Sequence, residues 1–173
     1  MGATRDDLVV TRWLARFRGR GFPCSVGQRG IAFNKIEGDR TTPAGSFGLA
    51  QILYRPDRIG GHQLPAGSRQ IRPCAIWSDD PADPGYNSPG KRTQGQSIRF
   101  RHERLFRADP LYDIVVVVVF NMNPAVPGRG SAIFLHCWRR PRVPTLGCIA
   151  FDRHDLLWIV NRLDHGTKLV VIG

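Results

Sequence analysis

The chain has 173 residues, of which 42% are hydrophobic and 23% are charged. These proportions are ordinary for a soluble globular protein and exclude a disordered or fibrous chain. The 25 Lys and Arg residues outnumber the 14 Asp and Glu residues, and the net charge of +11 predicts an anionic partner such as nucleic acid, an acidic membrane or an acidic polymer. The length suits a single domain, which we take as residues 1–173.

The cysteines and the N-terminal segment exclude several further classes of protein. Four cysteines are present, Cys24, Cys74, Cys137 and Cys148. None belongs to a C-x-x-C pair, so a zinc ribbon or a thioredoxin motif is excluded, and we predict no metal or other cofactor. Asp6 and Asp7 stand where a secretory signal would be positively charged, so no export signal is predicted. The longest apolar run, Ile114–Phe120, is too short to span a membrane.

Glycine and proline separate many short apolar segments, a pattern typical of a strand-rich domain. The expected strands are Asp7–Trp13, Gly30–Asn34, Gly45–Tyr54, Gln70–Ser78, Tyr112–Asn121, Ser131–Trp138, Gly147–Phe151 and Thr167–Ile172. Because Val115–Val119 is apolar without alternation, we predict a central strand covered on both faces. The polar, proline-rich segment Trp77–Arg92 predicts a long loop of the kind that binds ligands or forms lids.

One helix is well marked near the C-terminus. Asp152 can cap its first turn, where Asp155 also suits the helix dipole. Its apolar face comprises Leu156, Leu157, Ile159, Val160 and Leu163. The pattern ends at Gly166, and a weaker helical stretch is expected at Ser97–Arg107. The fold class predicted from these elements is a β-rich α+β domain, with one main helix packed against a curved sheet.

The segment richest in chemistry is Ser131–Phe151, in which an apolar strand ends at His136. A basic loop with prolines follows, and the TLGC run at Thr145–Cys148 leads into a second apolar segment. If the loop folds back, the imidazole and the thiol lie within about 3–4 Å of each other. An imidazole raises the thiolate fraction of a neighbouring cysteine, and a thiolate attacks acyl carbons. A core cysteine beside a merely hydrogen-bonded histidine is the alternative interpretation.

Backbone geometry predicts the roles of other residues in this region. Gly147 permits a close approach or a positive φ, and we expect the amides around Cys148 to face a developing oxyanion. Strand alternation predicts that Cys137 faces away from the groove that His136 enters. The other two cysteines are expected either in the core or, in an oxidising compartment, as a disulfide between Cys24 and Cys74.

The sequence resembles the L,D-transpeptidase catalytic domain (YkuD-type), a bacterial cell-wall family. Its histidine strand followed by [S/T]-x-G-C matches His136 and the run Thr145–Cys148, and its G-x-x-T-P-x-G-x-[FY] segment matches Gly38–Phe47 (GDRTTPAGSF). The resemblance extends from about Gly27 to the C-terminus. Most members carry His before the glycine and Arg or Asn two residues after the cysteine, whereas this chain has Leu146 and Ala150.

The resemblance implies a YkuD-like curved mixed sheet or β-sandwich with the helix after the cysteine. It implies that Cys148 is the nucleophile, that His136 is the general base and acid, and that the amides of Gly147 and Cys148 form the oxyanion hole. It also implies that a backbone carbonyl near Thr145 or Gly147 orients the imidazole. A carbapenem, which acylates the nucleophile of this family, would then form one adduct at Cys148.

The implied substrates are peptidoglycan stem peptides, both as acyl donor and as acceptor, and the implied compartment is the periplasm or cell wall. Transfer to an amine would make 3-3 or 1-3 cross-links or exchange D-amino acids. Transfer to water would make the same scaffold an L,D-carboxypeptidase or endopeptidase.

Side chains near the proposed groove could bind such a peptide. Arg139, Arg140 and Arg142 suit stem carboxylates because arginine binds carboxylates in bidentate geometry. A solvated basic loop is the alternative for these three residues. Tyr86 and Asn87, in the proline-rich loop, are expected to cover the substrate.

Two rival functions belong to other classes. Papain-like hydrolases place cysteine before histidine at the start of a long helix, and the order here is reversed. A nucleic-acid-binding module would explain the charge of +11. Its local signs are confined to Trp138-Arg139-Arg140 and Phe100-Arg101, so we expect no nucleic-acid partner.

Overall fold

The structure is a computed structural model that describes residues 3–92 and 99–173. The strands of its largest sheet are β1 (Leu8–Val10), β2 (Leu14–Phe17), β3 (Arg20–Ser25), β6 (Gly45–Tyr54), β7 (Arg69–Gln70), β11 (Ile114–Val118), β12 (Phe134–Cys137), β13 (Ile149–Phe151) and β14 (Lys168–Val171). The smaller sheets contain β4 (Ile31–Ala32) with β5 (Thr42–Pro43), and β8 (Ala75–Ser78) with β9 (Pro89–Lys91) and β10 (His102–Arg104). The helices are α1 (Arg153–Val160) and the short 3₁₀ segments η1 (Gly61–Gln63) and η2 (Pro110–Tyr112).

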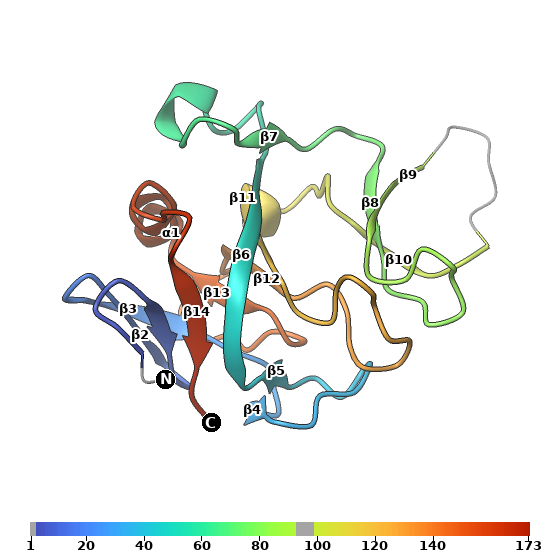
Figure 1. The fold of residues 1–173 in the computed structure, drawn as a ribbon. Helices are drawn as coiled ribbons and strands as arrows, with labels where there is room; N and C mark the ends of the chain where they lie inside the picture. The colour runs from blue at the N-terminus through green and yellow to red at the C-terminus, as the bar shows by residue number, and fades with distance from the viewer. Residues whose placement is uncertain (1–2, 93–98) are drawn as a thin grey trace.

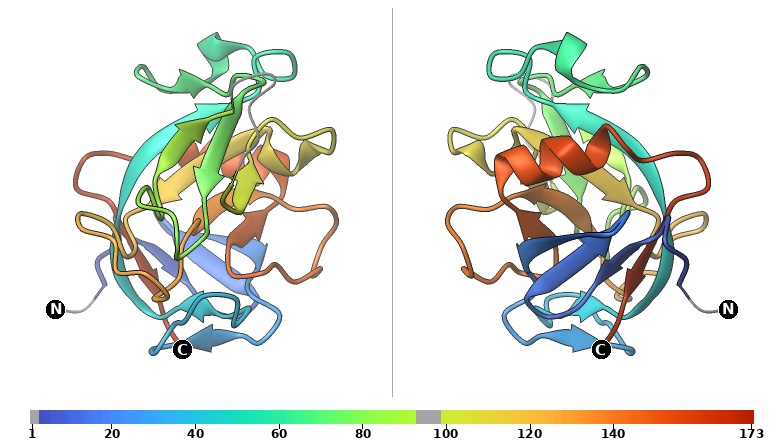
Figure 2. Two further views of the ribbon diagram at one scale, coloured as in Figure 1. Left: turned by 90° about the vertical axis from the view of Figure 1, so that its right-hand side faces the viewer. Right: turned by 90° about the vertical axis from the view of Figure 1, so that its left-hand side faces the viewer.

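The largest sheet closes on itself. Its strand order is β11-β12-β13-β3-β2-β1-β14-β6-β7, and β6 also pairs with β11, so that the ring is complete and β7 extends from β6 outside it. Parallel pairs, β1 with β14 and β12 with β13, occur among antiparallel ones. The long strand β6 runs through the middle of the view in Figure 1, curves around the molecule in Figure 2, and pairs with both β11 and β14. The expected curved mixed sheet is thereby confirmed.

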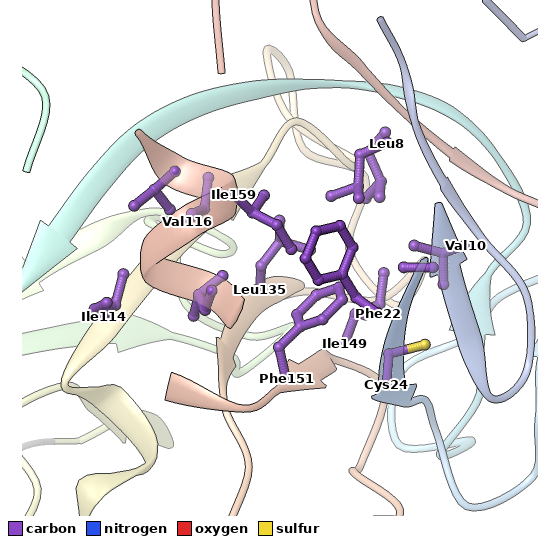
Figure 3. Close-up of a cluster of buried hydrophobic side chains, with 14 of the residues drawn as sticks. Leu8, Val10, Phe22, Cys24, Ile114, Val116, Leu135, Ile149, Phe151 and Ile159 are labelled. Atoms are coloured by element: carbon purple, nitrogen blue, oxygen red, sulfur yellow. The ribbon is translucent and has the colours of Figure 1, made fainter. Parts of the chain in front are cut away.

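Strand β11 is central, as its unbroken apolar sequence predicts. Ile114, Val116 and Val118 point into the main core, and Val115 and Val117 point into a second core on the other face. Helix α1 covers the first face and the three-stranded sheet β10-β8-β9 lies on the opposite side, as the two views of Figure 2 show. Figure 3 shows the main core, in which side chains from β3, β11, β12, β13 and α1 meet inside the ring.

Helix α1 begins where the sequence predicts it. The Asp152 carboxylate accepts a hydrogen bond from the His154 amide at 2.8 Å, which caps the first turn. The helix ends at Val160, before the predicted end at Gly166. Asn161 donates its side-chain amide to the carbonyl oxygens of Leu157 and Gln63, and this bonding replaces a further helical turn. In the described part of the chain, no helix is long and apolar enough to cross a membrane.

Two other expectations about local structure are wrong. The segment Trp77–Arg92 is not an irregular loop, because β8 and β9 pair across it as a hairpin. The described part of Ser97–Arg107, from residue 99 on, contains β10 instead of a helix. The pairing of Glu103 with Trp77 across β10 and β8 outweighs the helical preference of the isolated segment.

Strands β2 and β3 were not expected from the sequence. They form an antiparallel pair whose inward residues are Ala15, Phe17, Phe22 and Cys24. The exposed residues between them include Leu14 and Pro23 beside Arg16 and Arg20, so the residue types show no regular alternation of apolar and polar that would predict two strands. All four cysteines are free thiols, so the disulfide considered for Cys24 and Cys74 does not form. Cys24 lies in the main core, and its thiol donates to the Thr11 carbonyl at 3.6 Å.

Candidate active site

A cavity of about 750 Å³ opens where β12 and the segment entering β13 meet the loops after β4 and around β10. Its lining includes Lys35, Glu103, Tyr112, Ala132, His136 and Cys148. Histidine and cysteine thus reach one cavity from adjacent strands.

The register of β12 and β13 places both residues on the cavity. The strands run parallel with Leu135 opposite Ile149 and His136 opposite Ala150, so Cys148 lies just before β13, beside the start of β12. Cys148 packs against the second core, on the same side as the cavity. Cys137 is turned to the other face and belongs to the main core, as strand alternation predicts.

The His136 ring is fixed by its own neighbour. Its Nδ1 lies 2.8 Å from the Cys137 carbonyl oxygen, an acceptor only, so Nδ1 carries the proton and Nε2 has the free lone pair. The ring packs edge-on against Tyr112, with centroids 5.4 Å apart. Burial lowers the pKa of His136 to about 4, so the ring is neutral at pH 7. The expectation that a carbonyl near Thr145 or Gly147 orients the ring is wrong.

The Cys148 thiol is also neutral. It donates a hydrogen bond to the Ala132 carbonyl oxygen at 3.2 Å, and burial raises its pKa to about 12. A low-dielectric pocket disfavours the charged forms of both groups, so the thiolate expected from the sequence is not the resting state. The proton therefore has to leave the sulfur during the reaction.

Ala132 adopts an unusual backbone to reach the thiol. Its φ is +51°, a left-handed conformation that costs about 1–2 kcal/mol for an L-residue. Asn87 holds it there, since the Asn87 side-chain oxygen accepts from the Ala132 amide at 3.0 Å. The Asn87 amide donates to the carbonyl oxygens of Phe120 and Asn121.

This bonding changes the interpretation of two residues. Asn87 and Tyr86 are buried outside the cavity lining, so they do not cover a substrate. The Tyr86 hydroxyl donates to the Glu37 carboxylate, which also accepts from Ser131 at 2.7 Å. Both residues support the cavity wall from behind. The proline-rich sequence around them gives no sign of this burial, because it shows no regular periodicity.

The backbone around the cysteine is held by two threonine hydroxyls. Thr42 donates to the Gly147 carbonyl at 2.8 Å, and Thr145 donates to the Cys148 carbonyl at 2.6 Å. The Gly147 amide donates to the Thr145 hydroxyl at 3.1 Å. Of the two amides expected in an oxyanion hole, that of Gly147 is therefore engaged, whereas that of Cys148 has no acceptor among the described residues.

Gly147 is required by its surroundings. Its φ is +148°, and an added Cβ would lie 3.0 Å from the Thr41 carbonyl oxygen and 3.4 Å from Ile133. The first distance is shorter than ordinary contacts, so no larger residue fits without moving the loop.

The match to known families decides the assignment. A sequence model of the L,D-transpeptidase catalytic domain (YkuD) matches residues 9–172, nearly the whole chain. The chain belongs to this family. Comparisons with curated proteins and with solved structures gave no match. Membership makes the protein a cysteine-dependent enzyme that modifies peptidoglycan, in a family that acts on the cell wall.

In this L,D-transpeptidase-family domain, charged side chains of both signs surround the cysteine and histidine. Arg107 pairs with Glu103 at 2.9 Å and with Asp109 at 2.7 Å. Burial raises the pKa of Glu103, and the charge of Arg107 opposes this shift. Arg139 lines the cavity, 3.8 Å from Asp109, whereas Arg140 is exposed outside the lining. A mixed lining suits a peptide that carries both amino and carboxylate groups.

Sequence reasoning missed Tyr112 and Lys35, which line this YkuD cavity, and Thr42, which bonds to its backbone from outside the lining. Tyr112 was read as the start of a strand, and Thr42 as part of a motif only. Lys35 has a side chain only 4% exposed and pairs with Asp39 at 2.5 Å. The sequence around Lys35 and Asp39 gives no sign that the lysine is buried. Its burial comes from residues far along the chain, such as Gly130, that pack on its aliphatic stem.

Proposed function

We propose that the protein is an L,D-transpeptidase in which Cys148 is the nucleophile and His136 is the proton carrier. The supporting observation is that both side chains line one cavity while the Cys137 carbonyl leaves the Nε2 lone pair of His136 free. The substrate is a peptidoglycan stem peptide, and its carboxylates suit a protein with a net charge of +11. The reaction belongs to the periplasm or cell wall, where that polymer lies.

The first half-reaction forms a thioester. As the donor carbonyl approaches, the thiol proton moves to His136 Nε2, and the sulfur adds to the carbonyl carbon. The Cys148 amide faces the oxyanion that develops. The tetrahedral intermediate collapses, the C–N bond breaks, and the imidazolium gives its proton to the departing amine.

The second half-reaction reverses these steps with a new partner. An acceptor amine from a neighbouring stem loses a proton to Nε2, attacks the thioester carbonyl and forms an amide. The sulfur leaves and regains its proton from the imidazolium. Attack by water would instead give a free carboxylate, so the nature of the products distinguishes transpeptidation from hydrolysis.

Purified muropeptides and product analysis by mass spectrometry test this proposal. The wild type should form cross-linked dimers and should carry a single carbapenem adduct on Cys148 by intact mass. Cys148→Ala should lose both, while Cys137→Ser, the matched control in the main core, should keep both. Dimers formed by Cys148→Ala would refute the nucleophile, and monomers with a hydrolysed terminus as sole product would refute transfer to an amine.

A further inference from the structure

We propose that Thr42 is a positioning residue that turns the Cys148 amide toward the cavity and so preforms the oxyanion site. The inference rests on the proposed role of Cys148 as the nucleophile. Thr42 is fully buried, and it does not belong to the cavity lining that the described residues define. It therefore acts through the backbone and not by touching the substrate.

The hydroxyl of Thr42 has both of its principal bonds satisfied. It accepts from the Gly27 amide at 2.8 Å and donates to the Gly147 carbonyl at 2.8 Å. Its distance to the Cys148 carbonyl, 3.5 Å, is longer, so the single hydroxyl proton is directed at Gly147. A buried hydroxyl with this bonding defines one orientation of the peptide it holds.

The peptide between Gly147 and Cys148 is the one that matters for the oxyanion. A trans peptide is planar, with its carbonyl and amide on opposite sides. Because Thr42 draws the carbonyl oxygen into the interior, the Cys148 amide points the other way, on the side of the cavity. Gly147 has φ +148°, where glycine has more freedom than any other residue, so without the bond this peptide could turn.

Neighbouring bonds hold Thr42 itself in place. The Asp39 carboxylate accepts from the amide and hydroxyl of Thr41 at 2.9 and 2.8 Å, and from Lys35 at 2.5 Å. Thr42 also lies in β5, paired with Ile31 of β4. The loop that carries the threonine is thus fixed before a substrate arrives, as preorganised stabilisation of a transition state requires.

The test separates two reactions of the same sulfur. Imipenem acylates the cysteine at a carbonyl and needs an oxyanion site, whereas iodoacetamide alkylates it by displacing iodide and generates no oxyanion. Thr42→Val keeps the shape and removes the hydroxyl, and Thr42→Ser keeps the hydroxyl. Thr167→Val is the matched control, because Thr167 is buried and its hydroxyl accepts from the Asp164 amide and donates to the Asp164 carboxylate.

We expect Thr42→Val to slow imipenem acylation by about tenfold to a thousandfold, because losing an oxyanion donor outright costs about 10²–10³ and a misdirected donor costs up to that much. Its alkylation rate should stay within about twofold of the wild type, and Thr42→Ser should recover acylation. If Thr42→Val does not fold, Thr42→Ala is measured against Thr42→Ser in the same two assays.

Three results would overturn the inference. Acylation by the Thr42 variants could be no slower than by Thr167→Val, alkylation could fall together with acylation, or Thr42→Ser could fail to restore the rate. A different result, an imipenem adduct that persists in Cys148→Ala, would refute the proposed nucleophile and not the role of the threonine alone.

Discussion

Replacing Gly147 by alanine should damage both stability and acylation. The new methyl group would lie 3.0 Å from the Thr41 carbonyl oxygen and 3.4 Å from the Ile133 side chain, and the backbone would keep a φ of +148°. Backbone strain of about 1–3 kcal/mol and crowding of about 1–3 kcal/mol together predict a loss of about 4 kcal/mol in the free energy of unfolding. The shift of the Gly147–Cys148 peptide should slow imipenem acylation at least about tenfold.

Gly128→Ala is a control that separates the backbone strain from the steric crowding. Gly128 also has a positive φ, +83°, but an added Cβ meets no atom within 4 Å. Urea unfolding should therefore show a loss of about 1 kcal/mol for this control, with an unchanged acylation rate. Equal losses of stability in the two variants would refute the view that contact with Thr41 makes Gly147 necessary.

Two titratable groups give further predictions. Because the pKa of folded His136 is about 4, the rate of imipenem acylation should fall only as the pH drops through about 4, and a fall centred near pH 6.5 would contradict the burial of the ring. His136→Ala should slow acylation by about 10²–10⁴ and remove this dependence on acid pH. Asp39 is partly buried, which alone would raise its pKa, but hydrogen bonds from Lys35, Ile36 and Thr41 lower it from 3.8 to about 2. The charged carboxylate therefore stabilises the fold above pH 4 by about 2 kcal/mol, and this contribution is lost as pH falls toward 2. In urea unfolding, the difference between wild type and Asp39→Asn should shrink over that range, and a constant difference would refute the ion pair as its source.

The sequence predicted an element best where the residues of that element alone determine it. The unbroken apolar run at Val115–Val119 predicted a strand covered on both faces, and Asp152 predicted the start of α1. Both predictions depend on residues that are close together in the sequence. The strands β2, β3, β9 and β10 were not predicted because each is short and acquires its stability from a partner strand.

The order of the Gly38–Phe47 segment, the His136 strand and the Thr145–Cys148 run predicted the family, and the match over residues 9–172 shows it. The protonation states were not accessible in the same way. The proximity of His136 and Cys148 in the sequence predicted a raised thiolate fraction for Cys148 beside the imidazole, whereas burial leaves both groups neutral. Desolvation depends on every atom packed around a group, and no motif encodes that sum.

The amino-acid order alone thus specified the β-rich class and the capped helix, and it predicted the residues that we propose carry the chemistry, because these follow from periodicity and from residue types at short spacing. Only the tertiary structure decided which groups hydrogen-bond to the backbone around these residues. Thr42 reaches Gly147 across 105 positions of the chain, and Asn87 reaches Ala132 across 45. Such bonds depend on how distant strands and loops pack, and a sequence pattern records only what lies nearby along the chain.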